Sequence, residues 1–438
     1  METLPPGPRT TLRTTLAVAR APMETMRRLR ARYGDPFSLS TVNGMVVCTA
    51  EPELIREIFT AKDPELFETF ANEALTPFVG RHSLLLLSGE PHREERRLLM
   101  PPFHGEQMRA YGEAMAAATR AAFDGLAPGQ EFRALDVGQA ISLEVIVRAV
   151  FGVDEGGRVR EHTAAITSAL EAALPIFMFA KALQRAPFGL GPWARYERRS
   201  ARVDALLQAQ IDRVRPRAQE RSDILARMIC ARYEDGSAMS DQRIRDELRT
   251  LVIAGHETTA ITLAWALEAL HRDPAALERL LAELDGAGSD APDELARLPF
   301  LGAVVDETLR LHPVVEVVFR RLRKPMRLGG YEVPAGVALA PAIGLVHARE
   351  DLYPNAGRFD PQRMIDRRPS PFEYLPFGGG ARRCIGAAMA HYEARVVLGT
   401  ALRSWRLELQ ERGAVATVRR NLTLGPKTGV RMRMVGRR

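Results

Sequence analysis

A single cysteine enclosed by glycines and arginines constrains this chain more than any other feature of its sequence. Residues 377–386 read Phe-Gly-Gly-Gly-Ala-Arg-Arg-Cys-Ile-Gly, and the cysteine is Cys384. Glycine tolerates positive φ and lets a backbone approach a large flat ligand more closely than other residues allow. Apolar residues then recur at helical spacing from Gly386 to Trp405, so Cys384 lies just before a predicted buried helix. The free amide groups and the dipole at that helix start favour a thiolate, which is a metal ligand.

This loop has two interpretations, a structural cysteine in a glycine turn or a ligand-binding loop. It resembles the haem-binding loop of the cytochrome P450 family, whose pattern Phe-x-x-Gly-x-x-x-Cys-x-Gly is matched by Phe377, Gly380, Cys384 and Gly386. The resemblance implies that these residues bind haem b (iron protoporphyrin IX), with the Cys384 thiolate as the axial ligand of the iron. Electron donation from such a ligand favours cleavage of the O–O bond.

A second informative stretch lies inside a long predicted helix. Ser240 can cap a helix that runs from Asp241 to about Arg272. Residues 254–259, in its middle, read Ala-Gly-His-Glu-Thr-Thr. A glycine inside a helix costs about 1 kcal/mol relative to alanine, and the hydroxyl of Thr258 can bond back to the preceding turn. The helix is therefore weakened at one point, as is common where a ligand needs room.

The same run resembles the oxygen-binding segment of cytochromes P450, Ala-Gly-x-(Asp/Glu)-Thr-Thr. The resemblance implies that Ala254 and Gly255 contact the cofactor. It also implies that Glu257 and Thr258 are the carboxylate and the alcohol that guide protons to dioxygen. The His-Glu pair inside the run also begins a zinc-protease motif, His-Glu-x-x-His, but Ala260 stands where the second histidine is needed. The zinc interpretation is therefore excluded.

Four further side chains are candidate ligands of an anion. His92 and Arg96 are spaced i, i+4 on one face of a helix that begins near Gly89. Such a pair is usually a solvated face, but the resemblance implies a role in cofactor binding. It assigns His92 and Arg96, together with Arg320 and Arg382, to the two haem propionates. Their hydrogen bonds to the propionates would be charge-assisted.

An ion network is predicted before the cysteine loop. Glu307 and Arg310 lie at i, i+3 on a helix that ends at His312-Pro313. The resemblance implies that this pair meets Arg363, in the segment Phe-Asp-Pro-Gln-Arg-Met, although a methionine replaces the usual aromatic residue at its end. Such a buried network would orient the cysteine loop and add little net stability.

Two apolar stretches, residues 67–87 and 174–179, suggest a lipophilic substrate such as a terpene, steroid, fatty acid or macrolide-like molecule. Core packing explains the first stretch equally well, and a buried helix end explains the second. The candidate residues of the substrate pocket are Phe70, Phe78, Leu174, Phe177, Phe179, Ala254 and Val315.

The chain as a whole predicts a mainly α fold with small β-sheets, in a single domain over residues 1–438. Helical spacing covers residues 108–126, 141–151, 160–174, 196–214 and 300–311. The β-rich parts are expected near residues 36–50, 314–345 and 407–435, with a hairpin at Asn43-Gly44 and a terminal hairpin in the last part. The resemblance implies the cytochrome P450 fold, with haem between the long helix and the cysteine loop.

Composition excludes several classes of protein. No apolar run approaches the roughly 18 residues of a membrane span, and no signal-peptide core is present. The net charge of +7 comes from dispersed arginines, without the basic runs and interleaved aromatic residues of a nucleic-acid-binding surface. Cys48, Cys230 and Cys384 are odd in number and widely spaced, which fits a reducing compartment. We therefore expect a cytoplasmic, monomeric protein that binds no nucleic acid.

The motifs together imply a monooxygenase that hydroxylates or epoxidises a lipophilic small molecule with O2. The alternatives are a peroxide-driven haem-thiolate peroxygenase, which would not need Glu257 and Thr258, and a non-catalytic haem sensor. Because the sequence ends at Arg438 without a flavin or iron–sulfur domain, we expect electrons from an acidic ferredoxin or flavodoxin with its reductase. The candidate residues of a basic docking surface are Arg93, Arg97 and Arg383.

Overall fold

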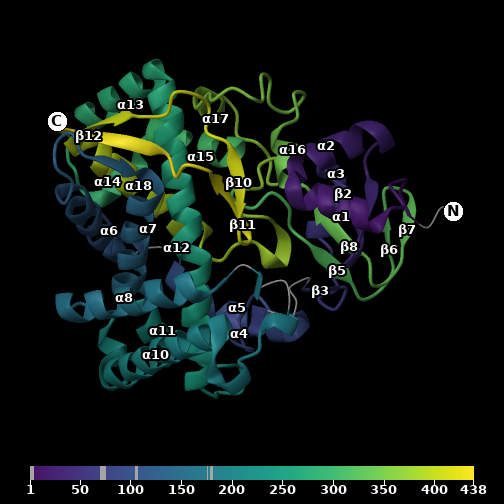
Figure 1. Ribbon diagram of the computed structural model, residues 1–438, viewed down its shortest axis with the longest axis horizontal. Helices are drawn as coiled ribbons and strands as arrows, with labels where there is room; N and C mark the ends of the chain where they lie inside the picture. Colours follow the sequence, from purple (N-terminus) through teal and green to yellow (C-terminus); the bar gives the residue numbers. More distant parts are fainter. Residues whose placement is uncertain (1–3, 70–74, 104–106, 175, 178–180) are drawn as a thin grey trace.

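A long central helix, α12 (Asp241–Arg272), organises the fold (Figure 1). The computed structural model describes residues 4–69, 75–103, 107–174, 176–177 and 181–438. The side chain of Ser240 accepts a hydrogen bond from the backbone N–H of Arg243 and so caps the helix start. Every residue from Thr259 to Leu270 is buried. The second half of α12 is therefore the middle of the core, and the predicted bounds of this helix are confirmed.

The other long helices pack around α12 and bury their apolar faces against it and against one another. They are α6 (Gln107–Asp124), α7 (Ala134–Val145), α8 (Gly156–Ala172), α10 (Gly191–Val214), α13 (Pro274–Gly286), α15 (Pro299–Leu311) and α18 (Ala387–Ser404). The predicted helices over 108–126, 160–174, 196–214 and 300–311 correspond to four of them. The helix predicted over 141–151 begins earlier, at Ala134, and continues into a π-helical turn, η3 (Ile146–Val150).

Shorter helices connect these elements. They are α4 (Thr76–Val79), α5 (Gly89–Leu99), α11 (Ile224–Cys230), α14 (Pro292–Arg297), α16 (Ile343–His347) and α17 (Gln362–Asp366). The 3₁₀ turns are η2 (Pro101–Phe103), η4 (Lys181–Leu183), η5 (Pro187–Gly189), η6 (Arg215–Glu220) and η7 (Gly380–Arg382). Proline stands in the first turn of α4, α13, α14 and α15, where its missing N–H breaks no helical hydrogen bond.

A five-stranded sheet forms the second part of the molecule, beside the N-terminal helices α1 (Thr11–Arg20), α2 (Pro22–Tyr33) and α3 (Pro52–Phe59) (Figure 1). Its strand order is β1 (Phe37–Thr41), β2 (Gly44–Thr49), β8 (Ala338–Pro341), β5 (Arg320–Leu322) and β3 (Phe67–Glu68). β1 and β2 form the predicted hairpin, in antiparallel register with Phe37 opposite Cys48. β2 and β8 pair in parallel. The sheet therefore joins segments that are far apart in the sequence.

The remaining strands form three small sheets. β6 (Met326–Leu328) pairs with β7 (Tyr331–Val333), β10 (Thr417–Arg420) pairs with β11 (Thr423–Pro426), and a third sheet has the order β4 (Glu131–Arg133), β12 (Arg431–Arg437), β9 (Trp405–Leu409). The terminal hairpin expected over 407–435 is present as the antiparallel pair of β10 and β11. The same range also contains the antiparallel pair of β9 and β12, and β12 pairs in addition with the distant β4, a pairing that the sequence does not predict. Alternation along the sequence reveals strands, but it does not identify their partners.

Two main clusters of buried side chains follow this division. One fills the space between the long helices, and the other lies between the five-stranded sheet, α2, α3 and α16. Helices α1 and α2 carried no prediction from the sequence. No helix within the described ranges is long and apolar enough to cross a membrane.

Candidate functional site

The cysteine loop lies between η7 and α18, and its conformation depends on its glycines. Gly378 and Gly380 have φ of 63° and 65°, in the left-handed region that favours glycine. The backbone N–H of Cys384 donates to the carbonyl of Phe377 at 3.0 Å and closes the loop. A Cβ atom at Gly380 would lie 2.5 Å from the carbonyl oxygen of Phe59. This glycine is therefore required by close packing on the end of α3, a reason that the sequence did not reveal.

The environment of Cys384 only partly matches the thiolate-favouring site that the sequence predicts. The residue is exposed, yet protein lies close enough around it that burial raises the pKa of its thiol above the usual range. The backbone N–H of Gly386 and the charges of Arg96 and Arg383 act in the opposite direction. Burial is the largest of these effects, so the protein groups alone do not hold a thiolate. A cation bound to the sulfur would supply the missing stabilisation.

The structure brings the predicted anion-binding side chains together. His92 and Arg96 come from α5, Arg320 from β5, and Arg382 from the cysteine loop. Burial and the charges of Arg382, Arg96 and Arg320 lower the pKa of His92 to about 3. Burial and Arg382 lower the pKa of Arg320 to about 10. Burial and Arg96 lower the pKa of Arg382 to about 10. The four groups therefore lie close enough to repel one another when charged.

This cluster has no anionic partner in the part of the chain that the structure describes. Arg382 donates to the carbonyls of Leu87 at 2.6 Å and Leu85 at 3.0 Å, and Arg320 donates to the carbonyl of Gly379 at 3.2 Å. No described carboxylate pairs with Arg320, Arg382 or Arg96. Collecting buried like charges is unfavourable unless an anion joins them. A flat ligand with two carboxylates and a central metal ion fits these residues together with Cys384.

The middle of α12 has the features predicted for a ligand-contacting segment. Ala254 is exposed, although the helix lies in the middle of the molecule. The hydroxyl of Thr258 donates to the carbonyl of Ala254 at 2.7 Å, the back-bond that the sequence predicts. A Cβ atom at Gly255 would lie 3.3 Å from Cδ1 of Ile146 in η3. Gly255 thus allows close packing of α12 against η3, while the neighbouring Ala254 is accessible to solvent or to a ligand.

Glu257 has two partners that could not be predicted from the sequence. Its Oε1 accepts from Nε of Arg420 at 3.3 Å, and its Oε2 accepts from the hydroxyl of Thr423 at 3.1 Å. Both partners belong to the hairpin of β10 and β11, more than 160 positions further along the chain. Polar residues in short strands are common and carry no motif, so only the tertiary structure identifies these two residues as partners of Glu257.

The predicted ion network is present, and it joins α15 to the segment around α17. Arg310 donates from Nε and Nη2 to the two carboxylate oxygens of Glu307, both at 2.8 Å. Nε of Arg363 donates to Oε1 of Glu307 at 3.0 Å. The same oxygen accepts from the backbone N–H of Asp360 at 3.0 Å. The side chains of Arg310 and Glu307 are 1% and 0% exposed. The carboxylate of Glu307 is therefore shielded from solvent and hydrogen-bonded within this network.

The candidate residues of the substrate pocket do not form one group. Phe70 and Phe179 lie outside the described residues. Phe78 and Phe177 are buried in an aromatic cluster, with their ring centroids 6.1 Å and 5.2 Å from that of Trp193. These two side chains are therefore used for packing, the alternative that the sequence left open. Ala254 and Leu174 are exposed, and Val315 is half-buried.

The three arginines predicted to bind an electron-donor protein differ in whether their charges are already paired with a carboxylate. Arg93 pairs with Glu90 at 3.0 Å, and Arg97 pairs with Glu234. Arg383 is exposed, and it forms no ion pair within the ranges that the structure describes. Its charge also lies near enough to Cys384 to oppose the effect of burial, which raises the pKa of the thiol. Arg383 is therefore the arginine best placed to meet an anionic partner.

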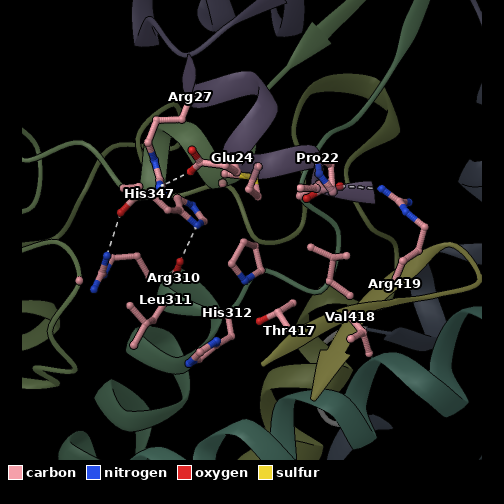
Figure 2. Close-up of a pocket in the computed structure, with 18 of the residues that line it drawn as sticks. Pro22, Glu24, Arg27, Arg310, Leu311, His312, His347, Thr417, Val418 and Arg419 are labelled. Carbon is pink, nitrogen blue, oxygen red and sulfur yellow. Dashed lines mark hydrogen bonds and ion pairs between the residues drawn. The ribbon is translucent and has the colours of Figure 1, made fainter. Parts of the chain in front are cut away.

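A cavity of about 840 Å³ lies elsewhere, between α2, the end of α15 and β10 (Figure 2). Figure 2 shows His312 and Arg419 at its wall. Cys384, Glu257 and Thr258 are not among its lining residues. This cavity is therefore separate from these three predicted site residues.

Comparison with known proteins identifies the group to which these features belong. The family model described as Cytochrome P450 matches residues 5–430. Cytochrome P450 135B1 of Mycobacterium tuberculosis (strain ATCC 25618 / H37Rv) is 38% identical over 440 residues, covering 98% of this chain and 91% of that protein. Cytochrome P450 138 of the same strain is 37% identical over 417 residues, covering 93% and 90%.

Solved structures share the fold along the whole chain. A cyanobacterial protein, CYP120A1 with bound retinoic acid, superimposes with a TM-score of 0.86 at 22% identity and covers 99% of both chains. The heme domain of cytochrome P450DA gives a TM-score of 0.86 at 24% identity, covering 100% of this chain and 99% of the other. The mainly α fold with small sheets is thus the cytochrome P450 fold, as the sequence predicts.

Proposed function

Because the chain belongs to the cytochrome P450 family, we propose that it is a haem-thiolate monooxygenase. The reaction inserts one oxygen atom of O2 into a lipophilic small molecule, by hydroxylation or epoxidation, and reduces the other atom to water. In balanced form it is RH + O2 + 2 H⁺ + 2 e⁻ → ROH + H2O for a hydroxylation. The two electrons come from a separate reductase system.

The observation that carries this proposal is the cluster of basic side chains beside the cysteine loop. Arg320, Arg382, Arg96 and His92 converge without a described carboxylate partner, and each has its pKa lowered by burial. Two propionates would satisfy these groups with charge-assisted hydrogen bonds. Cys384 lies in the same loop as Arg382, so one ligand can reach both. Haem b, when bound, supplies the redox-active iron that activates O2.

The side chains of α12 supply protons in this proposal. Glu257 is an acid with 18% of its side chain exposed, so it can exchange protons with water. The hydroxyl of Thr258 gives its own hydrogen to Ala254, which leaves its oxygen lone pairs free to accept from a water molecule. A carboxylic acid and an alcohol in adjacent positions can then hold and pass protons toward the oxygen being reduced.

The two alternative functions make different demands on these residues. A peroxygenase that follows RH + H2O2 → ROH + H2O needs neither electrons nor an external proton supply. A haem sensor needs no acid beside the ligand. Glu257, held by Arg420 and Thr423 next to Thr258, supports the monooxygenase over both.

Thr258→Ala is expected to uncouple the reaction. With 7-ethoxycoumarin as an apolar probe substrate and a [2Fe–2S] ferredoxin with its NADPH-dependent reductase, product per NADPH should fall about tenfold, and hydrogen peroxide should accumulate instead. The reason is that the hydroxyl no longer orders the proton-carrying water. Product, NADPH and peroxide are measured in the same reaction.

Thr262→Ala is the matched control, because its hydroxyl also bonds back along α12, to the carbonyl of Thr258 at 3.1 Å, but is buried. It should retain coupling within about twofold. Equal coupling in the wild type and Thr258→Ala would remove Thr258 from the mechanism. A wild type that forms product with peroxide alone, and none with the reductase, would support the peroxygenase.

Electron transfer is expected to depend on Arg383. Reduction by an acidic ferredoxin should slow about tenfold in Arg383→Glu, because reversal of an unpaired charge weakens a steered encounter. Added salt should slow the reduction of the wild type, so that its rate approaches the rate of Arg383→Glu. The reason is that charges are screened over ~8 Å at physiological ionic strength. Stopped-flow reduction measures the rate.

Arg93→Glu is the comparison for this prediction. Arg93 already pairs with Glu90, so its reversal should have a smaller effect on the reduction rate than that of Arg383. The spectrum of the carbon monoxide complex should stay unchanged in both variants. Reduction that is independent of salt and of either reversal would place the docking surface elsewhere.

A further inference from the structure

The hairpin of β10 and β11 carries the two partners of Glu257 and is firmly attached to the core. The backbone N–H of Leu424 donates to the carbonyl of Val314 at 2.8 Å. A Cβ atom at Gly425 would lie 3.2 Å from Cγ1 of Ile261, so β11 packs directly on α12. A side chain on this hairpin is thus held at a fixed place relative to α12. Rigid elements position functional groups more accurately than loops do.

Arg420 is the stronger of the two partners. The hydroxyl of Thr423 has one hydrogen, and two acceptors are within reach of it, Glu257 at 3.1 Å and the carbonyl of Arg420 at 2.7 Å. The shorter contact is the one to the carbonyl. The guanidinium of Arg420 instead gives Glu257 a charge-assisted hydrogen bond. The position of the carboxylate therefore depends chiefly on Arg420.

The carboxylate needs such a support because it has few others. Among the described residues, the carboxylate forms its hydrogen bonds and its ion pair with Arg420 and Thr423. Glu257 is half-buried at the point where α12 opens at Ala254. A glutamate there has three side-chain torsions and would sample several positions. Proton transfer requires a donor within hydrogen-bond reach, about 2.6–3.2 Å, so loss of position costs rate.

We propose that Arg420 is a positioning residue for proton delivery, which holds the Glu257 carboxylate beside Thr258 from the β10–β11 hairpin. This rests on the proposed monooxygenase function, in which two protons enter for each O2 reduced. Arg420 does not touch the reacting atoms in this scheme. Its effect on turnover passes entirely through Glu257.

The neighbouring Arg419 provides a matched control. Its Nη2 donates at 2.8 Å to Oε1 of Glu316, on the side of the cavity in Figure 2. The side chains of Arg419 and Arg420 are 39% and 33% exposed, and each forms one ion pair with the residues that the structure describes. Arg419→Gln and Arg420→Gln thus remove the same charge from the same strand with similar exposure. Only the second removes a partner of Glu257.

The choice of oxidant separates proton delivery from general damage. Turnover with O2 and reductase consumes two external protons, whereas hydrogen peroxide brings oxygen that already carries them. With haem-loaded enzyme and 7-ethoxycoumarin, Arg420→Gln should lower product per NADPH about tenfold. Peroxide-supported product formation should stay within about twofold of the wild type. Arg419→Gln should stay within about twofold in both assays.

Two further variants test whether Arg420 acts through Glu257. Arg420→Lys keeps the charge but loses the planar guanidinium, so it should restore part of the coupling. In the Glu257→Gln background, Arg420→Gln should cause no further loss, because the group it positions is already disabled. If Arg420→Gln does not fold, Arg420→Lys carries the test, with an expected loss of about threefold. Thermal unfolding of the same single and double variants measures the interaction of Arg420 with Glu257 without turnover. The shifts of the unfolding midpoint in the two single variants should not add up to the shift in the double variant.

The possible results separate this inference from the proposed function. If the wild type makes product with reductase, and Arg420→Gln is as well coupled as Arg419→Gln, the positioning role is wrong and the monooxygenase function stands. Equal losses with peroxide and with reductase would also overturn it, since proton delivery would not be the affected step. A wild type without the carbon monoxide band or reductase-driven product would overturn the proposed function itself, and the role of Arg420 with it.

Discussion

Cys384→Ser is expected to abolish the red-shifted Soret band that carbon monoxide gives with reduced, thiolate-ligated haem. A serine hydroxyl is far less acidic than a thiol and does not provide the soft, electron-donating anion that the cysteine provides. Reductase-driven product formation should fall by about 100-fold or more, because cleavage of the O–O bond depends on that donation. The reduced carbon monoxide difference spectrum is the measurement.

The other two cysteines are matched controls for this substitution. Cys230 is half-buried and Cys48 is buried, and neither belongs to a segment with the glycine pattern. Cys230→Ser should keep the band at full height. A band that persists in Cys384→Ser, or one that disappears in Cys230→Ser, would contradict ligation by Cys384.

Glu307→Leu is expected to lower the free energy of unfolding of the protein strongly. The carboxylate of Glu307 accepts two hydrogen bonds from Arg310, one from Arg363 and one from the backbone of Asp360. Removing it leaves the charge of Arg310 buried and unpaired. The free energy of unfolding should fall by about 3–5 kcal/mol, as for other broken buried pairs. Urea unfolding followed by far-ultraviolet circular dichroism measures this change at equal haem loading.

Arg363→Met provides a graded comparison for the same network. The side chain of Arg363 is 12% exposed and forms one hydrogen bond to Glu307. Arg310 keeps both of its bonds to the carboxylate in this variant. The loss should therefore be smaller, about 1–3 kcal/mol. A Glu307→Leu protein within 1 kcal/mol of the wild type would mean that the network carries little of the stability.

Much of the fold follows from local patterns in the sequence. Ser240 and the helical spacing after it predict α12 with its observed bounds, because capping and periodicity are local properties. The hairpin at Asn43-Gly44 is predicted for the same reason. The pairing of β12 with β9 and β4 could not be predicted this way. Its partners are separated by a long chain, and alternation in each strand is compatible with many partners.

The candidate site divides in a similar manner. Fixed spacing relates Cys384 to its glycines, and Glu257 to Thr258, so these groups can be found in the sequence. The substrate-pocket assignments of Phe78 and Phe177 could not be settled there. Whether an aromatic side chain lines a cavity or packs in a core depends on its neighbours, and here these include Trp193 and Tyr196.

The sequence by itself determined the motifs from which the chemistry is predicted, because a candidate ligand loop and an acid–alcohol pair each lie within one short segment. Only the tertiary structure decided how those segments are supported. It placed Phe59 against Gly380, gathered three arginines and His92 without a carboxylate partner among the described residues, and set Arg420 on Glu257. These contacts join residues far apart in the chain, where spacing carries no information. They depend on the packing of helices and sheets, which sets the distances between residues that are far apart in the sequence.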